Sequence, residues 1–424
     1  MARSIAIIGG GAAGTLTAIH FARASRETVQ ATIIEPRSAL GEGVAYGTAD
    51  SAHLLNVPAS GMSAYGDDTT SFVRRAGCAP DDFVARSRYA EYLRAELTAA
   101  RAANTNFVVR HCQASAERIT VATGPSTMRH HVSTSDAESI EADVVILALG
   151  NATPTRPPWV SNFFARPLIV DPWAAGALDA IADGAKVLCV GTGLTFVDIA
   201  LSLARRDARV TGVSRHGLLP HVHAPIAALP KLPDGFASPR EVVRWVRAQP
   251  DWRAAFAALR PVTQRLWRTF TDEQQAQFLR HARRYWDVHR HRMSPTVADE
   301  IARLRRAGLI AVHRGDARAF AESGDYDVVV LCTGPDDAAL RSTPPLAGLI
   351  NDGIASAGPH DMGIATDADT GQLIDSRGRL VAGLFAIGTL RRGTLWESTA
   401  VPEIRVEAQR LAALFSTMRD SSPK

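Results

Sequence analysis

A cluster of glycines follows an apolar run near the start of the chain, at a spacing that suits phosphate binding. Residues 5–8 are apolar and lead into Gly9, Gly11 and Gly14, and residues 15–22 continue with a helical pattern. In a GxGxxG turn the first glycine permits the turn, the second admits a pyrophosphate, and the third lets helix and strand pack closely. The free N–H groups at the start of the helix then face the phosphates.

A carboxylate stands where such a site needs one. Glu35 ends a second apolar run, on the far side of the predicted helix, at roughly the distance at which an acid binds a ribose hydroxyl. Strand, turn, helix and acid agree, so residues 3–35 are predicted to form a β-α-β unit that binds a dinucleotide. The alternative is a glycine-rich turn without a ligand.

A second stretch repeats this pattern incompletely. Residues 186–190 are apolar and a helix is predicted after the turn, but Phe196 stands where a third glycine would be. The predicted contacts to a second dinucleotide are Gly191, Gly193, Leu194 and Thr195.

The strand after this second turn ends without a carboxylate. Residues 209–213 lead instead into Ser214 and Arg215. An arginine at this strand end accommodates a 2′-phosphate, which favours NADPH over NADH, with NADH still possible. The alternative is an exposed arginine without this role.

Further stretches could surround a cofactor ring. The glycine-rich loop 41–62 is predicted to form a wall of the site, with the Asn56 amide facing a polar ring edge, because long ordered loops are usually functional. The alternative is a surface excursion. Two buried strands end near Gly150 and Gly334, where the chain is expected to cross between nucleotide domains, and a third ends at Gly388.

The C-terminal helix, predicted from residue 401 to 414, would aim its positive end at an electron-rich ring such as a reduced flavin. Four residues just before this helix are the candidates beside the ring: Trp396, Glu397, Ser398 and Thr399.

Residues 236–310 change character and are predicted to be helical. Ser238 and Thr271 begin capping signatures, and Ser294 precedes a proline that suits a first helical turn. A polar segment in this insert offers His289, Arg290 and Arg292 as anchors for a small polar or anionic substrate. Structural hydrogen bonds, a solvated helix face or a basic nucleic-acid patch are the alternatives. No metal is predicted, because the histidine pairs lack a third ligand at zinc-like spacing.

Composition limits the class of protein. The chain has 424 residues, 46% of them apolar, and a net charge of +4, which does not by itself imply nucleic acid. The four cysteines are scattered without a CxxC pair, which disfavours a dithiol flavin reductase and suits a reducing cytoplasm. A signal peptide is not expected, and no apolar run reaches the about 18 residues of a spanning helix.

Several stretches together resemble a bacterial FAD/NAD(P)-binding oxidoreductase family that includes a flavin-dependent urate hydroxylase. More distantly, the layout is similar to flavin-containing and N-hydroxylating monooxygenases, but their FxGxxxH-type fingerprint is missing, so Baeyer–Villiger chemistry is not implied. The stretches that carry the resemblance are residues 43–47, 54–58, 191–195, 214–220, 286–292 and 396–402.

The resemblance implies an α/β fold of two Rossmann-like domains with a helical insert. The expected boundaries are 1–155 and 315–418 for the FAD domain, 156–235 for the NAD(P)H domain and 236–314 for the insert. The implied FAD contacts are Gly9, Gly11, Gly14, Glu35, Gly150 and Gly388.

The resemblance further implies a flavin monooxygenase. NAD(P)H reduces FAD, and a C4a-hydroperoxyflavin formed with O₂ oxygenates a small polar, nitrogen-containing substrate. Two alternatives stay open: an NAD(P)H-dependent flavoprotein reductase that passes electrons to a small acceptor or protein, and a flavoprotein that binds nucleic acid. The charge balance argues against the second.

Overall fold

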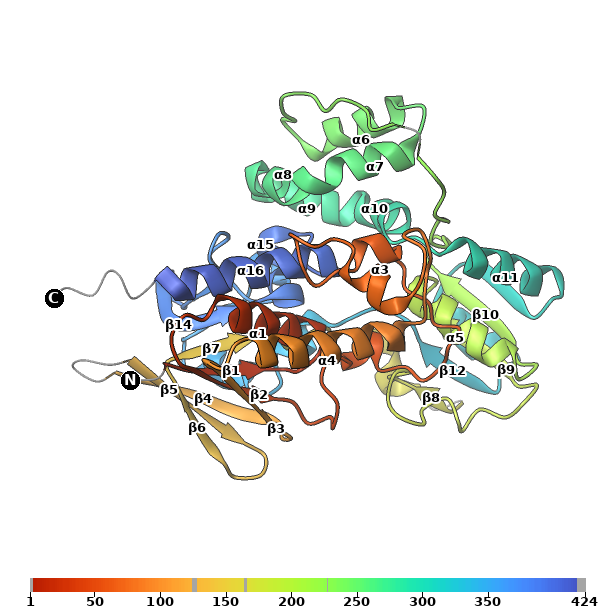
Figure 1. Cartoon of the computed structure of the whole chain (residues 1–424). Coiled ribbons are helices and arrows are strands. Elements are labelled where there is room, and N and C mark those ends of the chain that lie inside the picture. Colours follow the sequence, from red (N-terminus) through yellow and green to blue (C-terminus); the bar gives the residue numbers. More distant parts are fainter. Residues whose placement is uncertain (1–2, 124–127, 164–165, 227, 418–424) are drawn as a thin grey trace. The chain divides into compact units, whose positions relative to one another are not determined.

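A computed structural model describes residues 3–123, 128–163, 166–226 and 228–417 of the chain (Figure 1). The chain divides into two compact units. Unit 1 comprises Met1–Ala49, Val57–Asn151 and Asp337–Lys424, and unit 2 comprises Asp50–Asn56 and Ala152–Asp336. Two of the crossings between units directly follow Asn151 and Asp336, close to the two strand ends where crossings were predicted.

Unit 1 is built on a six-stranded sheet in which only one edge pairing is antiparallel. The central strand is buried from Ile5 to Ile8, as expected for a parallel strand that is covered on both faces. The strands lie in the order β13 (Gln372–Ile374), β14 (Leu380–Ala386), β7 (Val144–Leu147), β1 (Arg3–Ile8), β2 (Val29–Ile34) and β3 (Phe107–Cys112).

The long helices of unit 1 pack on one another beside this sheet. Helix α1 (Ala12–Ala24) is buried from Ala13 to Ala22 and contacts both α4 (Arg86–Ala103) and α16 (Val401–Thr417) (Figure 1). The short elements are α2 (Gly43–Tyr46), η1 (Ala59–Gly61), α3 (Ser71–Ala76), α13 (Asp337–Arg341), α14 (Leu346–Asn351), η4 (Pro359–Asp361), η5 (Gly388–Arg391) and α15 (Arg392–Leu395).

A separate antiparallel sheet in unit 1 contains β4 (Ala116–Thr123), β5 (Met128–Thr134) and β6 (Ser139–Ala142). From the sequence alone, residues 107–135 are expected to form strands of a small antiparallel patch. That prediction was wrong for β3, which pairs in parallel with β2 and extends the main sheet. Residues 124–127 of the predicted patch lie outside the described residues.

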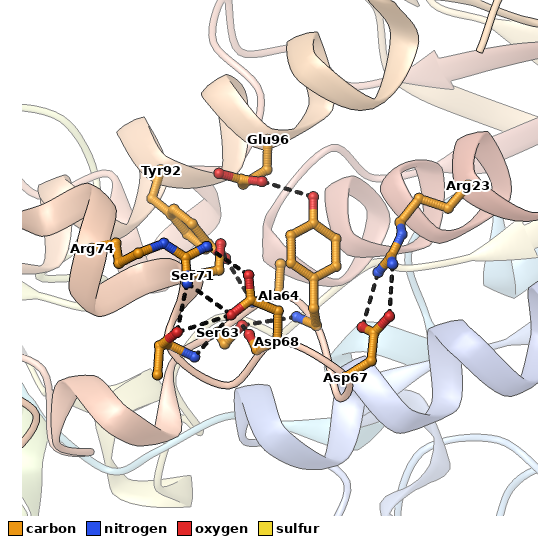
Figure 2. A network of polar contacts seen from close by, with 11 residues as sticks. Arg23, Ser63, Ala64, Asp67, Asp68, Ser71, Arg74, Tyr92 and Glu96 are labelled. Atoms are coloured by element: carbon orange, nitrogen blue, oxygen red, sulfur yellow. Dashed lines mark hydrogen bonds and ion pairs between the residues drawn. The ribbon is translucent and has the colours of Figure 1, made fainter. Parts of the chain in front are cut away.

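Polar contacts fix the segment between η1 and α3 (Figure 2). Asp67 binds Arg23 of α1 at 2.8 Å, and Asp68 binds Arg74 of α3 at 2.6 Å. The segment is therefore tied to both helices by ion pairs. Two further hydrogen bonds reach α4, from the Ala64 N–H to the Tyr92 hydroxyl (2.9 Å) and from the Tyr65 hydroxyl to Glu96 (2.7 Å).

Unit 2 contains a five-stranded parallel sheet with helices on both faces. Val187 and Cys189 pack with α5 (Leu194–Ala204) and α11 (Pro295–Arg306), whereas Leu188 and Val190 pack with residues of α12 (Ala317–Ser323). Alternate residues of one strand thus bury into opposite layers, the pattern of a doubly wound sheet. The strand order is β11 (Ile310–Arg314), β10 (Arg209–Ser214), β9 (Lys186–Val190), β12 (Val328–Leu331) and β8 (Leu168–Ile169).

The helical insert forms where its caps predicted. Ser238 accepts from the Glu241 N–H, Thr271 forms a complete capping box, and Ser294 accepts from the Val297 N–H. Each cap satisfies N–H groups that a helix start leaves without partners. The helices are α6 (Pro239–Ala248), α7 (Trp252–Leu259), α8 (Thr263–Thr269), α9 (Asp272–His281) and α10 (Arg283–Arg290); η2 (Pro158–Asn162) and η3 (Arg260–Val262) complete the unit.

The compact units differ from the expected domains in two ways. The first domain was expected to resume at residue 315, but β12 lies beyond that point and completes the sheet of unit 2 by pairing with β9. Residues 50–56 also belong to unit 2, because Asp50 pairs with Arg205 at the end of α5 and His53 contacts the hydroxyl of Ser202 within α5. Within the described residues, no helix is long and apolar enough to cross a membrane.

Candidate functional site

The first glycine turn has the geometry that its spacing predicts. Gly9 has φ +101°, and a Cβ there would stand 2.5 Å from the Ala148 carbonyl oxygen. A Cβ on Gly14 would overlap the Gly9 carbonyl oxygen, so the glycine is needed for close packing of α1 on the turn. Gly11, the N-cap of α1, is less crowded, with Gly43 Cα 3.4 Å from the Cβ position.

Glu35 is buried at the end of β2 and closes this turn. Its Oε2 accepts from the Gly10 N–H at 2.9 Å, and its Oε1 accepts from the N–H and the guanidinium of Arg37, each at 3.1 Å. These bonds hold the carboxylate beside the glycine turn. A carboxylate held in this place can accept from a ribose hydroxyl.

Three glycines lie at one edge of the unit 1 sheet. β1, β7 and β14 are parallel neighbours, and Gly9, Gly150 and Gly388 follow their carboxyl ends. Ligands of open α/β sheets bind at that edge. The structure therefore brings together the predicted contacts Gly9, Gly11, Gly14, Glu35, Gly150 and Gly388 at this edge of unit 1.

Part of the predicted loop wall lies on the first turn. The Gly41 N–H donates to the Gly10 carbonyl at 2.7 Å, and Gly43 approaches Gly11. Asn56 belongs to unit 2, where its carbonyl accepts from His223 Nε2 at 3.0 Å. The other ring candidates belong to unit 1, so a shared position beside a flavin ring stays a prediction.

A buried ion pair lies behind Gly388, and the sequence did not reveal it. Glu407 Oε2 accepts from the Gly388 N–H at 3.2 Å and from Arg391 Nη1 at 3.1 Å, and both charged side chains are buried. Burial raises the pKa of Glu407, and Arg391 opposes that rise. Glu407 and Arg391 are 16 residues apart, and only the fold joins them.

The ring candidates contain an unusual backbone turn. Trp396 has φ +63° and ψ −61°, and the Glu397 N–H donates to the Leu395 carbonyl at 2.8 Å. This is a γ-turn of the rare, strained kind. Ser398 is two residues further along the chain. Its hydroxyl is buried and makes no hydrogen bond within the described chain. Strain of this kind concentrates at ligand and catalytic sites.

Helix α16 begins at Val401, two residues after Thr399. Its positive end and first N–H groups therefore follow directly on the strained turn. Such a terminus stabilises negative charge that develops on a ligand.

The second glycine turn in unit 2 repeats the first with one exchange. Gly191 has φ +112°, and a Cβ there would overlap the Cys332 carbonyl oxygen. Phe196, in place of the third glycine, lies on Gly212 of β10, where a Cβ would stand 2.6 Å from its ring. The close packing of helix and strand thus uses a glycine on the strand. The sequence did not single out Gly212, although a lone glycine inside a strand signals close approach.

Hydrogen bonds join this turn to the end of β10. The Thr192 hydroxyl donates to the Leu218 carbonyl at 2.6 Å and lies 2.9 Å from the Ser214 hydroxyl, which also accepts from the Gly217 N–H at 3.0 Å. Arg215 follows and is exposed. The predicted contacts Gly191, Gly193, Leu194, Thr195, Ser214 and Arg215 therefore lie at one edge of the unit 2 sheet.

The predicted substrate anchors lie together at the end of α10. His289 Nδ1 donates to the Tyr285 carbonyl at 2.7 Å, and its ring stacks on Phe256. Arg290 ends the helix, and Arg292 follows, half-buried.

One group of potential metal ligands occurs among the described residues: Cys112, Asp136 and Glu138 in unit 1. Glu138 already forms a bidentate pair with Arg110 at 2.6 and 3.0 Å, which satisfies much of its charge.

Known proteins resemble the chain in part by sequence and throughout by fold. Residues 6–152 match the sequence family described as FAD-NAD(P)-binding. No curated protein has a significantly similar sequence.

Similar solved structures cover nearly the whole chain. An ornithine N-hydroxylase from Kutzneria sp. 744, solved with reduced FAD, NADP⁺ and L-ornithine, has a TM-score of 0.61 at 15% identity, with 100% of both chains covered. A flavin-containing monooxygenase from Stenotrophomonas maltophilia has a TM-score of 0.58 at 18% identity and covers 99% of this chain and 100% of its own. A bacillithiol disulfide reductase from Bacillus cereus has a TM-score of 0.53 at 14% identity, with coverages of 98% and 99%.

The chain shares its fold with these three structures. The predicted α/β class with two Rossmann-like sheets is therefore confirmed, and residues 6–152 are similar to an FAD-NAD(P)-binding family. Because a disulfide reductase shares this fold, likeness of fold alone does not separate oxygenation from electron transfer.

Proposed function

We propose that the protein is an FAD-dependent, NAD(P)H-consuming monooxygenase that acts on a small polar, nitrogen-containing substrate with O₂. The observation that carries the proposal is the pair of glycine turns, Gly9 against Ala148 and Gly191 against Cys332, each at the carboxyl edge of its own parallel sheet. Two such edges suit two dinucleotides. An ornithine N-hydroxylase of similar fold, solved with reduced FAD, NADP⁺ and L-ornithine, supports the substrate class.

The residues of unit 1 suit FAD. The turn at Gly9–Gly14 and the carboxylate of Glu35 would hold its pyrophosphate and ribose, and Gly150 and Gly388 admit the ligand at the sheet edge. When bound, FAD accepts hydride from NAD(P)H and activates oxygen.

The segment from Trp396 to Thr399 is the proposed ring contact in unit 1. The start of α16 would place its positive end towards a reduced flavin, and the Ser398 hydroxyl, which makes no hydrogen bond within the described chain, is a donor available to a ring oxygen. Asn56 is proposed as a further ring contact from unit 2.

The residues of unit 2 suit NADPH. The turn at Gly191–Thr195 would bind the pyrophosphate at the start of α5, and Ser214 and Arg215, at the end of β10, would recognise a 2′-phosphate. Arg215→Gln should weaken NADPH binding by at least about tenfold and leave NADH binding little changed. Arg209→Gln, at the opposite end of the same strand, is the matched control. Equal KM values of the Arg215 variant and the wild type for NADPH would contradict the 2′-phosphate role.

Spectroscopy of the purified protein tests the central proposal. A yellow protein whose flavin is bleached by NADPH without oxygen would establish both cofactors. A protein that stays colourless after reconstitution with FAD would refute it.

Oxygen transfer requires its own test. With labelled O₂ and a panel of small amines that includes L-ornithine, the oxygenase should insert label into an organic product. NADPH consumption that yields only peroxide, or anaerobic turnover with an added acceptor, would favour the reductase instead. The sequence lacks the CxxC pair of a dithiol reductase, which supports the oxygenase.

We place this activity in the cytoplasm, with no role for nucleic acid.

A further inference from the structure

Arg292 of unit 2 is a cation that lacks an ion-pair partner in the part of the chain that the structure describes. Its side chain is half-buried, and its Nε is fully buried with no hydrogen-bond partner in the described chain. It forms no ion pair with any described residue. A guanidinium N–H that loses water and gains no acceptor is unfavourable, so such a group calls for a ligand.

A second guanidinium shares the same aromatic surface. Arg253 lies 4.3 Å and Arg292 5.8 Å from the centre of the Trp252 ring. Arg253 Nε donates to the Val222 carbonyl at 3.2 Å, which fixes the direction of its fork. Two positively charged guanidinium groups thus lie on one indole ring. Neither forms an ion pair with a described residue.

Two histidines complete the group. The rings of His221 and His289 lie 4.4 Å apart, and both lie near Trp252, at 5.0 and 4.7 Å. Because His289 Nδ1 donates to the Tyr285 carbonyl, its Nε2 is the nitrogen left for another partner. We name Arg253, Arg292, His221, His289 and Trp252 the Trp252 cluster.

The electrostatics agree with an uncompensated positive site. Burial, followed by Arg290, Arg253 and Arg260, lowers the pKa of Arg292 to about 10. Burial and the neighbouring His289, Arg253 and Arg292 lower the pKa of His221. Asp251 acts in the opposite direction and raises this pKa, and its carboxylate also caps α7 by accepting from the Arg253 N–H at 2.8 Å.

We propose that the Trp252 cluster binds the carboxylate of the substrate, so that the substrate is a small nitrogen-containing carboxylic acid. This inference rests on the proposed monooxygenase function. Two guanidinium forks can each bind a carboxylate through paired hydrogen bonds, and a bound anion would neutralise the group. The Trp252 ring beside both guanidinium groups shields them in part from water and strengthens such bonds.

A matched pair of probes tests the anion preference on the full chain. Benzoate and benzamide share a ring and differ by the charge of one group. Benzoate should raise the Tm of the wild type at lower concentration than benzamide does. Arg292→Gln should weaken the benzoate response by at least about tenfold. Arg247→Gln, which removes an exposed arginine of α6 in the same unit, should keep the response.

A second readout distinguishes binding from a structural role. Because Arg292 is unpaired, Arg292→Gln should raise the Tm of the ligand-free protein. A lowered Tm together with an intact benzoate response would mean a structural arginine and overturn the proposal. No stabilisation of the wild type by benzoate or by inorganic phosphate would overturn it too.

Nucleotide affinities show whether the anion bound by the Trp252 cluster is the substrate carboxylate or a phosphate of the nucleotide. Arg292→Gln should leave the affinity for NADP⁺ and NAD⁺ unchanged. Weaker binding of NADP⁺ alone would assign the cluster to the 2′-phosphate, and weaker binding of both to the pyrophosphate; either result overturns the substrate assignment. Because FAD retention and anaerobic bleaching by NADPH are measured separately, failure of the carboxylate site is distinguishable from failure of the proposed function.

Discussion

Glu407 carries an acidic group into the interior of unit 1 and supports a backbone turn there. One of its oxygens accepts from both Gly388 and Arg391, while Arg391 also donates to the carbonyls of Asp367 and Ala368 at 3.0 and 2.8 Å. The pair thereby connects α16, the turn after β14 and the turn before β13. A buried pair of this kind specifies geometry more than it adds stability.

Loss of the charge on Glu407 should therefore be destabilising. Glu407→Gln leaves Arg391 buried without a counter-charge and should lower the free energy of unfolding by about 3 kcal/mol. Adding Arg391→Met removes the unpaired charge and should recover part of that loss. Urea denaturation of the two single variants and the double variant measures the coupling. Simple addition of the two single effects would show that the ion pair is not formed.

Gly14 and Gly193 should respond differently to an added methyl group. Alanine is the better helix former by about 1 kcal/mol, but at Gly14 its Cβ meets the Gly9 carbonyl, so Gly14→Ala should instead lose about 2 kcal/mol and release FAD. Gly193→Ala meets no atom within 4 Å and should keep its stability while NADP⁺ binds more weakly. Thermal unfolding and flavin absorbance after gel filtration check both. A Gly14→Ala variant that retains FAD would contradict the packing argument.

At the scale of elements, α5 and β10 show how one close contact can be built from two different residues. In unit 1 the helix supplies the small residue, Gly14, whereas in unit 2 the strand supplies it, Gly212, beneath Phe196. The Phe196 ring is fully buried in the core below the second glycine turn. Two turns with similar strand and helix geometry therefore tolerate different third residues.

A methyl group on Gly212 should disturb this contact. Gly212→Ala places a Cβ 2.6 Å from the Phe196 ring and should lower the free energy of unfolding by about 1–3 kcal/mol. Phe196→Leu in the same chain gives the methyl room and should recover part of the loss. Gly235→Ala, where no atom lies within 4 Å, is the control. Denaturant unfolding followed by fluorescence measures all three. No recovery in the double variant would place the strain elsewhere.

For the whole molecule, local patterns predicted the elements well. The strand, turn and helix at Gly9, the second turn at Gly191 and the helix caps at Ser238 and Thr271 all depend on neighbours close in sequence. Such features follow from backbone geometry and hydrogen-bonding rules.

Features that join distant residues could not be predicted in this way. The assignment of β3 to the main sheet depends on pairing with β2, and the extension of unit 2 to residue 336 depends on β12. The Arg391–Glu407 pair and the Trp252 cluster arise only when helices pack. The γ-turn at Trp396 has no local signal, because surrounding structure holds a strained conformation in place.

Two buried histidines of unit 1 and one half-buried histidine of unit 2 give both units the same response to acid. Burial lowers the pKa of His20 from 6.5 to about 4, and burial likewise lowers the pKa of His130 in unit 1 and of His223 in unit 2. Each histidine is therefore held neutral in the folded chain, while the unfolded chain takes up a proton more readily. The contribution of these histidines to the free energy of unfolding is complete above about pH 6.5 and is lost as the pH falls towards 4.

His20 offers the sharpest test of this dependence. Its Nε2 lies 3.0 Å from the Ala64 carbonyl, and Arg23, Asp67 and Arg405 act on it electrostatically, with the two arginines lowering its pKa further. Since one pH unit corresponds to about 1.4 kcal/mol, the fall from pH 6.5 to 4 should remove about 3 kcal/mol through this residue.

His20→Gln keeps a donor for the Ala64 carbonyl and removes the titration, so its free energy of unfolding should fall less steeply between pH 6.5 and 4 than that of the wild type. His281→Gln, which changes an exposed histidine of α9, should leave the wild-type slope intact. Urea denaturation across this pH range measures the slopes. Equal slopes for the His20 variant and the wild type would mean that protonation of His20 does not lower the free energy of unfolding.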